Sequence, residues 1–207
     1  MKLVLFGTGM IGSRILTEAL MRGHTITVVK RDLKKYNPPA GTVKVVKGDA
    51  LDPVSVAEVS IDHDAVLCAI SGTPDILRNT PRSLLDGLTN SGVKRLLIVG
   101  GAGSLEVKPG LKLLDTPSFP ESWRDIAMAH DDALNSYRKN MTINWTFLCP
   151  AAIIAPGKRT GKFRLGGDQL ITDKNGESHI SAEDYAIAFL DEAEKPAHIR
   201  QRFTLGY

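Results

Sequence analysis

Hydrophobic positions along the first 150 residues follow two alternating spacings. Short runs of apolar and β-branched residues predict buried strands, and between them apolar residues recur every three or four positions, which predicts helices. This alternation predicts an α/β fold, a Rossmann-type doubly wound parallel sheet with helices on both faces. The expected strands cover residues 2–6, 25–30, 43–47, 65–70, 94–99 and 142–149, and the expected helices cover residues 10–22, 52–60, 80–91 and much of 121–140.

The pattern changes after residue 150. Residues 156–176 are rich in glycine and charge. Ser181 and Asp184 stand three positions apart at the start of a last expected helix, as in a capping box. We therefore expect a single domain over residues 1–207, with a core over about 1–150 and a small C-terminal, substrate-side extension over about 151–207. The short strands expected in this extension are 170–172 and 202–205.

The first expected strand runs directly into a glycine turn that opens the first expected helix. The turn reads Gly7-Thr8-Gly9-Met10-Ile11-Gly12, which has the spacing G-x-G-x-x-G within a strand–helix–strand unit. In that motif the first glycine permits a tight turn, the second lets a pyrophosphate approach the backbone, and the third lets helix and strand pack closely. Free N–H groups and the helix dipole attract the phosphates. We expect all six residues to bind a nicotinamide dinucleotide.

The end of the second expected strand bears on the choice between NAD and NADP. Asp32 lies twenty residues after Gly12, a spacing that suits an acidic residue bound to the ribose hydroxyls of NAD. Lys30 and Arg31 come first, however, and the guanidinium of Arg31 suits a 2′-phosphate and can stack on adenine. We therefore expect NADP with Arg31 as a specific contact, and NAD stays open as the alternative.

Two further strand ends belong to the same edge, because ligands in open α/β sheets lie at the carboxyl ends of the strands. Asp49 and Ala50 follow the third expected strand and would contact the adenine. Ser71 and Gly72 follow the fourth expected strand and would pass beside the ribose of the nicotinamide half.

Composition narrows the class of protein. The formal net charge is +3, and no basic segment has the form of a nucleic-acid-binding module. No apolar run is long enough to span a membrane, and the N-terminus lacks a signal-peptide pattern. We therefore expect a cytoplasmic protein with a small-molecule substrate, as a monomer or a homodimer. The two cysteines lie in apolar segments and the five histidines are scattered, so neither a disulfide nor a metal site is expected.

One catalytic motif is missing. Short-chain dehydrogenases that reduce ketones use Tyr-x-x-x-Lys, in which the tyrosine gives a proton and the lysine lowers the pKa of the tyrosine. Four residues after the first three tyrosines stand Ala40, Met141 and Phe189, and the fourth tyrosine ends the chain. A flavin or quinone takes hydride into a delocalised ring, so positioning could suffice without such an acid. The sequence therefore leaves the catalytic residue unknown.

Several longer strings carry a resemblance to a known family. The start MKLVLFGTGMIGSRI, followed by RGHTITVVKRD, resembles the first unit of the NADH-flavin reductases, a family of NmrA-like atypical short-chain dehydrogenases. Many relatives read G-A-T-G-x-x-G at the turn, whereas this turn is one residue shorter. The resemblance runs nearly end to end through VKRLLIVGGAGSLEVKPG, LLDTPSFPESW, WTFLCPAA, RTGKFRLGGDQL, SAEDYAIAFLDE and HIRQRFTLGY.

The resemblance implies NAD(P)H binding and a flavin or quinone as the acceptor. It also implies that Arg31 occupies the position of an arginine in relatives, and that Gly101, Ala102 and Pro150 lie at the nicotinamide end. The acceptor would lie between the loops after the fifth and sixth strands, where an aromatic ring can stack on a flat substrate. The candidate contacts there are Ser104, Trp123 and Phe163.

The expected function is hydride transfer from NAD(P)H to a flavin, quinone or similar acceptor. Two alternatives stay open. One is a non-catalytic sensor that binds the dinucleotide and reports its redox state to a partner. The other is a reductase or epimerase of a small carbonyl substrate, with an acid that the sequence does not reveal.

Overall fold

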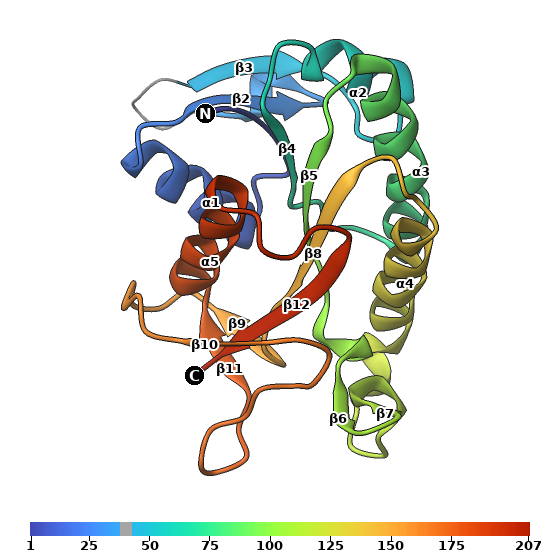
Figure 1. Cartoon of the computed structure of the whole chain (residues 1–207), viewed down its shortest axis with the longest axis vertical. Helices are drawn as coiled ribbons and strands as arrows, with labels where there is room; N and C mark the ends of the chain where they lie inside the picture. Colours follow the sequence, from blue (N-terminus) through green and yellow to red (C-terminus); the bar gives the residue numbers. More distant parts are fainter. Residues whose placement is uncertain (38–42) are drawn as a thin grey trace.

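The computed structural model describes residues 1–37 and 43–207, and its strands and helices follow the predicted order (Figure 1). The long strands agree with the predicted ones to within two residues at either end. They are β1 (Lys2–Phe6), β2 (Thr25–Lys30), β3 (Val43–Lys47), β4 (Ala65–Cys68), β5 (Arg95–Val99), β8 (Asn144–Cys149) and β12 (Gln201–Gly206). The α-helices are α1 (Met10–Met21), α2 (Pro53–Ser60), α3 (Pro74–Ser91), α4 (Glu121–Arg138) and α5 (Ala182–Glu194).

These strands form one sheet, which a short strand β10 (Arg164–Gly166) extends at its edge. The strand order is β10-β12-β8-β5-β4-β1-β2-β3. Neighbouring strands are parallel except for β10, which is antiparallel to β12. The chain builds outward from β1 in one direction and from β4 in the other, so the strand order reverses between these two strands. This confirms the doubly wound fold and places the ligand-binding crevice at the carboxyl ends of β1 and β4.

The two faces of the sheet bury separate cores. Leu3 and Leu5 of β1 point to the face covered by α1 and α5, whereas Val4 and Phe6 point to the face covered by α2, α3 and α4. This alternation is the strand period of two that the sequence shows. Figure 1 shows the two helical layers on opposite sides of the strands.

Local signals fix most of the helix boundaries. The Ser181 hydroxyl accepts a hydrogen bond from the Asp184 backbone N–H at 3.0 Å, which confirms the predicted cap of α5. The prediction for α3 is wrong by six residues, because the helix begins at Pro74 rather than Thr80. Thr80-Pro81 has the form of a helix start, yet Pro81 lies inside the helix and is buried. Proline at the first position of a helix has no N–H bond to lose, which suits Pro74.

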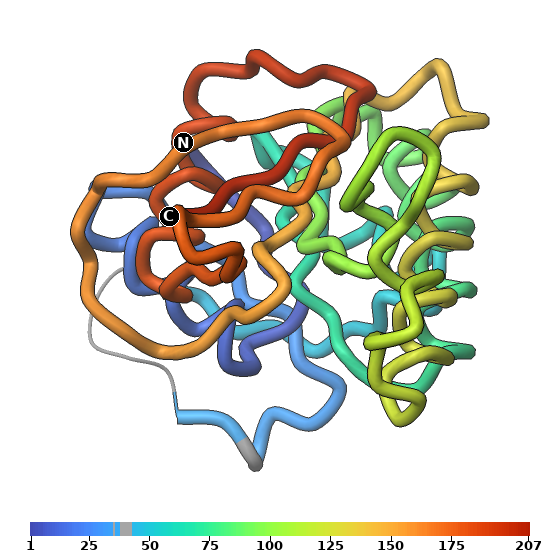
Figure 2. The backbone as a smooth tube through the Cα atoms, turned by 90° about the horizontal axis from the view of Figure 1, so that it is seen from below, coloured from blue at the N-terminus to red at the C-terminus, as the bar shows by residue number. Residues whose placement is uncertain are grey.

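The connections at the carboxyl ends of the strands carry the smaller elements. Strand β9 (Ile153–Ala155) pairs in parallel with β11 (His179–Ser181), and β6 (Glu106–Lys108) forms a hairpin with β7 (Leu111–Lys112). Figure 2 views the molecule from the side on which these connections gather. The strand predicted at 170–172 is wrong, since the strands of that segment are β10 and β11. The remaining turns of helix are η1 (Leu33–Lys35), η2 (Ala102–Ser104) and η3 (Leu113–Asp115).

Within residues 1–37 and 43–207, no helix is both long enough and apolar enough to cross a bilayer.

Candidate functional site

A cleft of about 420 Å³ opens at the carboxyl ends of β1 to β4, where the strand order reverses. A volume of this size is typical of small-molecule sites. The glycine turn forms one wall, and the ends of β2 and β3 form the other. The cleft brings together seven residues that the sequence predicts as cofactor contacts: Gly7, Thr8, Gly9, Arg31, Asp49, Ala50 and Ser71.

The three glycines of the turn differ in the space around them. A Cβ on Gly7, whose φ is +90°, would lie 2.3 Å from the Ala69 carbonyl oxygen, so the turn has no room for a side chain there. A Cβ on Gly12 would lie 2.1 Å from the carbonyl oxygen of Gly7, which is the close packing of helix on strand. A Cβ on Gly9 would meet nothing nearer than the Ser71 hydroxyl at 3.9 Å. The open position is the one at which the motif admits a pyrophosphate.

The N-terminus of α1 faces the cleft without a negative charge of its own. Gly9 is the N-cap and supplies no side-chain acceptor, and the first turn contains no acidic residue. The first N–H groups of a helix have no partner within it. Met10 is exposed and Ile11 is half-buried, and neither these two residues nor Gly12 lines the cleft, so their predicted contact with the dinucleotide stays a prediction. The arrangement suits an anion such as a pyrophosphate.

Lys30 is the basic side chain held closest to the glycine turn. Its Nζ donates a hydrogen bond of 2.7 Å to the Thr8 hydroxyl and lies 4.4 Å from the centroid of the Tyr36 ring. The sequence predicted Arg31 rather than Lys30 as the specific contact for NADP. Arg31 lines the cleft, and its side chain is exposed. Strand alternation could have identified Lys30, because it shares a face with Val28, on the α1 side of the sheet.

The two acidic side chains that line the cleft, those of Asp32 and Asp49, accept hydrogen bonds from the backbone of the loops that they belong to. An Asp32 oxygen accepts a hydrogen bond of 3.0 Å from the Lys34 backbone N–H and caps η1. Asp49 does the same for the N–H of Leu51, also at 3.0 Å. Both carboxylates therefore have backbone partners while they line the cleft.

The residues predicted for the nicotinamide end follow strands next to this cleft and do not line it. Gly72 is exposed after β4, Gly101 and Ala102 are half-buried after β5, and Pro150 is buried after β8. They occupy the same carboxyl edge of the sheet as the cleft, on the β4 side of the point where the strand order reverses.

The structure does not bring the three predicted substrate contacts together. Ser104 is buried, and its hydroxyl and carbonyl oxygens accept hydrogen bonds of 3.0 and 2.9 Å from Arg202. Trp123 is 64% exposed near the start of α4. Phe163 packs against the core on the α1 and α5 side, and it lines a separate groove with Phe203.

Three of the four tyrosines are placed for roles other than proton transfer. Tyr137 and Tyr185 are fully buried, and burial raises the pKa of both well above its ordinary value. The Tyr185 hydroxyl donates to the Leu148 carbonyl at 2.7 Å, and that of Tyr207 donates to Asp184 at 2.7 Å. Tyr36 lies beside Lys30 at the edge of the glycine turn. The geometry therefore agrees with the missing Tyr-x-x-x-Lys motif.

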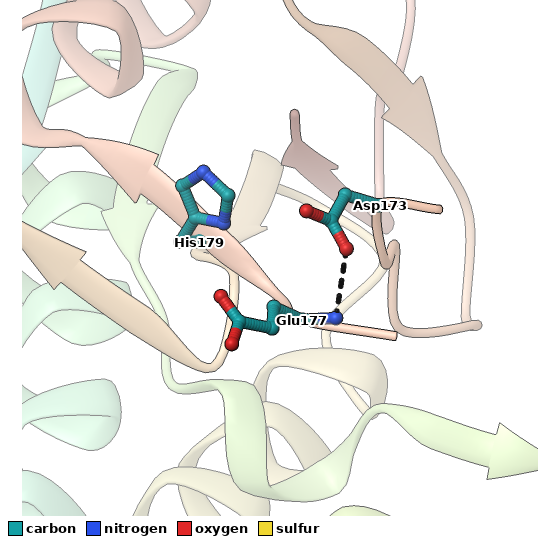
Figure 3. A group of neighbouring side chains, drawn as sticks. All are labelled: Asp173, Glu177 and His179. Atoms are coloured by element: carbon teal, nitrogen blue, oxygen red, sulfur yellow. Dashed lines mark hydrogen bonds between the residues drawn. The ribbon is translucent and has the colours of Figure 1, made fainter. Parts of the chain in front are cut away.

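Among the described residues, one group of potential metal ligands lies outside the cleft, in the loop that precedes β11 and at the first residue of β11. Figure 3 shows Asp173, Glu177 and His179, whose ligand atoms all lie within 4.8 Å of one another. The Asp173 carboxylate accepts hydrogen bonds from the backbone N–H groups of Asn175 and Glu177, at 2.8 and 2.9 Å. These bonds hold the pKa of Asp173 below its ordinary value. The two hydrogen bonds to Asp173 close a surface turn, and this turn explains why Asp173 and Glu177 lie close together.

Comparisons with known proteins agree with this fold. A protein of Bacillus subtilis named YwnB is 38% identical over 99% of this chain and 98% of its own. The structure of a Bacteroides thetaiotaomicron protein provisionally named an epimerase is 43% identical, with a TM-score of 0.94 over 100% of this chain and 96% of its own. A Streptococcus pneumoniae structure provisionally named an NADH-flavin reductase is 35% identical, with a TM-score of 0.85 over 100% of this chain and 99% of its own.

A sequence model of one family covers most of the chain. The NAD(P)H-binding family matches residues 7–196, a range that begins at the first glycine of the turn and extends past α5. The matched range includes the glycine turn, the ends of β2 and β3, and every strand of the sheet except β1 and β12. The chain therefore belongs to the NAD(P)H-binding family, and its fold is that of a Rossmann-type oxidoreductase.

Proposed function

We propose that the protein is an NADP(H)-dependent oxidoreductase that transfers hydride to a flavin, a quinone or a similar delocalised acceptor. The observation that carries the proposal is the cleft itself, in which an open glycine, an uncapped helix N-terminus and a lysine converge. The bound dinucleotide would supply the hydride. The chain would bind the dinucleotide, hold it at the edge of the sheet and position the acceptor beside it.

The choice of NADP(H) over NAD(H) rests on the basic residues at the end of β2. Lys30 and Arg31 both line the cleft, and the Lys30 ammonium is held within 2.7 Å of Thr8. An ammonium and a guanidinium are the usual partners of a 2′-phosphate. Asp32, the residue that would favour NAD, accepts a backbone hydrogen bond from Lys34.

Two findings support the choice of acceptor. Tyr137 is fully buried and the hydroxyls of Tyr185 and Tyr207 are bonded within the protein, and hydride uptake by a delocalised ring needs no tyrosine as an acid. The Streptococcus pneumoniae relative, 35% identical over the whole chain, also bears a provisional name for flavin reduction.

The test is oxidation of reduced nicotinamide by the purified protein. NADPH or NADH is mixed with FMN, FAD, riboflavin or 1,4-naphthoquinone, and the loss of absorbance of the reduced nicotinamide is followed. We expect saturable oxidation that is faster with NADPH than with NADH. If NADPH binds and none of these acceptors oxidises it, the proposal is wrong.

The name of the Bacteroides thetaiotaomicron relative, 43% identical, favours a second candidate, an epimerase of a small substrate. An epimerase that returns hydride to its substrate produces no net oxidation of the dinucleotide. Activity on carbonyl compounds with no flavin or quinone reduction would favour this candidate over the first.

A further inference from the structure

One histidine lies against the loop that follows β5. His130 is on α4, and a Cβ on Gly101 would lie 2.8 to 3.0 Å from three carbons of His130, two of them in the ring. Gly101 therefore lacks a side chain at the point where the imidazole rests. Gly103, two residues further along the chain, makes the same close approach to Ala127 of α4, with 2.6 Å between the two Cβ positions. Two contacts thus press the loop after β5 onto the His130 face of α4.

This contact lies at the end of the sheet where the acceptor would bind. The loop follows β5 at the carboxyl edge, and β5 lies next to β4 on the side of the strand reversal away from the adenine-side cleft. In a doubly wound sheet a dinucleotide crosses the reversal point, so its second half lies over the ends of these strands. Figure 2 views this edge, with the connections after β5 close to α4.

The imidazole of His130 is available for a ligand. His24, His63 and His198 each form ring hydrogen bonds of 2.8 to 3.2 Å within the protein, and His179 lies edge-on to the Tyr207 ring. Across residues 1–37 and 43–207, His130 has no hydrogen-bond partner for either ring nitrogen, although the side chain is only partly exposed. A half-buried imidazole without a partner in the protein can donate its N–H to a ligand.

His130 is also neutral at physiological pH, because burial lowers its pKa to about 4. The two acidic residues that follow it in the sequence are each paired with a cation. Asp131 accepts from Lys112 at 2.5 Å, and Asp132 accepts from Arg78 at 2.8 Å. A neutral imidazole keeps one N–H, so it can donate a hydrogen bond without carrying a proton that it must release.

We propose that His130 is a catalytic residue whose ring N–H hydrogen-bonds the acceptor atom on which negative charge develops during hydride transfer. The inference rests on the proposed function, because it names a residue for that reaction. The C–H bond of the reduced nicotinamide breaks, and its hydrogen leaves with the electron pair. The pair forms a new bond to the acceptor ring, which becomes a reduced anion, while the dinucleotide becomes oxidised. The imidazole stabilises the anion, and solvent supplies the later proton.

The test compares His130→Phe and His130→Gln with the wild type. Phenylalanine fills the space without an N–H donor, whereas glutamine retains one. Turnover is measured with NADPH and either FMN or 1,4-naphthoquinone, and NADPH binding is measured separately by fluorescence titration. We expect His130→Phe to lose about a hundredfold or more in kcat, the usual size of one lost charge-stabilising donor, with an unchanged Kd for NADPH. His130→Gln should recover part of that loss.

His63→Gln is the matched control, because His63 lies at the opposite, amino-terminal end of β4 and should not change turnover. Wild-type kcat in His130→Phe, or equal kcat values in the Phe and Gln variants, overturns the role of His130 and leaves the proposed function standing. Loss of NADPH binding in parallel with kcat would make the role structural and also overturns it. A wild type that reduces no acceptor overturns both proposals.

Discussion

At the scale of residues, the three glycines of the turn serve two different purposes: two of them are needed for packing and one leaves room for a ligand. Gly7 and Gly12 are glycine because backbone atoms occupy the space of a side chain, whereas Gly9 has open space beside it. Folding and ligand binding therefore depend on different members of the same turn. The two roles can be separated by single substitutions that add one methyl group.

Gly12→Ala should destabilise the protein. The new methyl group would lie 2.1 Å from the Gly7 carbonyl oxygen, and overpacking of this kind costs about 1–3 kcal/mol. The free energy of unfolding in urea measures the loss. Gly9→Ala should unfold at nearly the wild-type urea concentration but bind NADPH more weakly, because its methyl group fills the open position. Equal stability of the two variants would refute this division of roles.

The half-buried imidazole of His130 should make stability depend on pH. Its pKa falls from 6.5 to about 4 on folding because of burial, so the unfolded chain takes up the proton first. The contribution of neutral His130 is complete above pH 6.5 and is lost as the pH falls from 6.5 toward 4. The free energy of unfolding should decline there by up to about 1.4 kcal/mol per pH unit more than in His130→Gln. Parallel pH curves for the two proteins would contradict this.

At the scale of elements, a buried ion pair ties α5 to the sheet. Arg95 of β5 donates to both the Glu192 carboxylate and the Glu192 carbonyl, each at 2.9 Å, and to the Thr146 hydroxyl at 2.7 Å. The side chains of Arg95 and Glu192 are 10% and 4% exposed. His198, before β12, adds a 2.8 Å contact to the same carboxylate. One charged group therefore joins β5, β8, α5 and the approach to β12.

Arg95→Met should cost about 3–5 kcal/mol of stability, because it leaves the Glu192 carboxylate buried without its cation. Arg95→Met combined with Glu192→Gln should cost less than the two single changes added together. Chemical denaturation of the four proteins measures the coupling. Arg82→Met provides the control, since its ion pair with Asp86 is exposed and should contribute almost nothing. Additive losses in the double variant would show that the pair does not act as a unit.

The strands and most helices could be predicted because their signals are local. Apolar runs mark β1 to β5, and Asp52 and Ser181 cap the helices that follow them. The start of α3 could not be placed, because Thr80-Pro81 and Thr73-Pro74 offer the same local signal and only packing decides between them. The short strands β9 and β10 depend on partners about 26 and 42 residues away along the chain, which no local pattern reveals.

At the scale of the whole molecule, one part of the candidate site could be predicted from the sequence and another part could not. The glycine turn and the ends of β2 to β4 were predictable, because topology alone brings the carboxyl ends of parallel strands together. The contacts of the substrate could not be predicted. Ser104 is bound by Arg202 and Phe163 packs against the core, and both contacts join residues far apart in the sequence. The position of His130 could not be predicted from the sequence for a similar reason. Its place beside Gly101 depends on how α4 packs on the loop after β5.

The central claim is that the cleft binds NADP(H) and that Lys30, together with Arg31, meets its 2′-phosphate. The most direct measurement is a titration of NADPH and NADH into the wild type, Lys30→Met and Lys47→Met. Lys47 ends β3 with an exposed side chain outside the cleft and serves as the control. We predict that Lys30→Met weakens NADPH binding at least about tenfold, as expected for a lost charge-assisted bond, and leaves NADH binding and the control unchanged. Equal weakening for both dinucleotides, or none, would contradict the account.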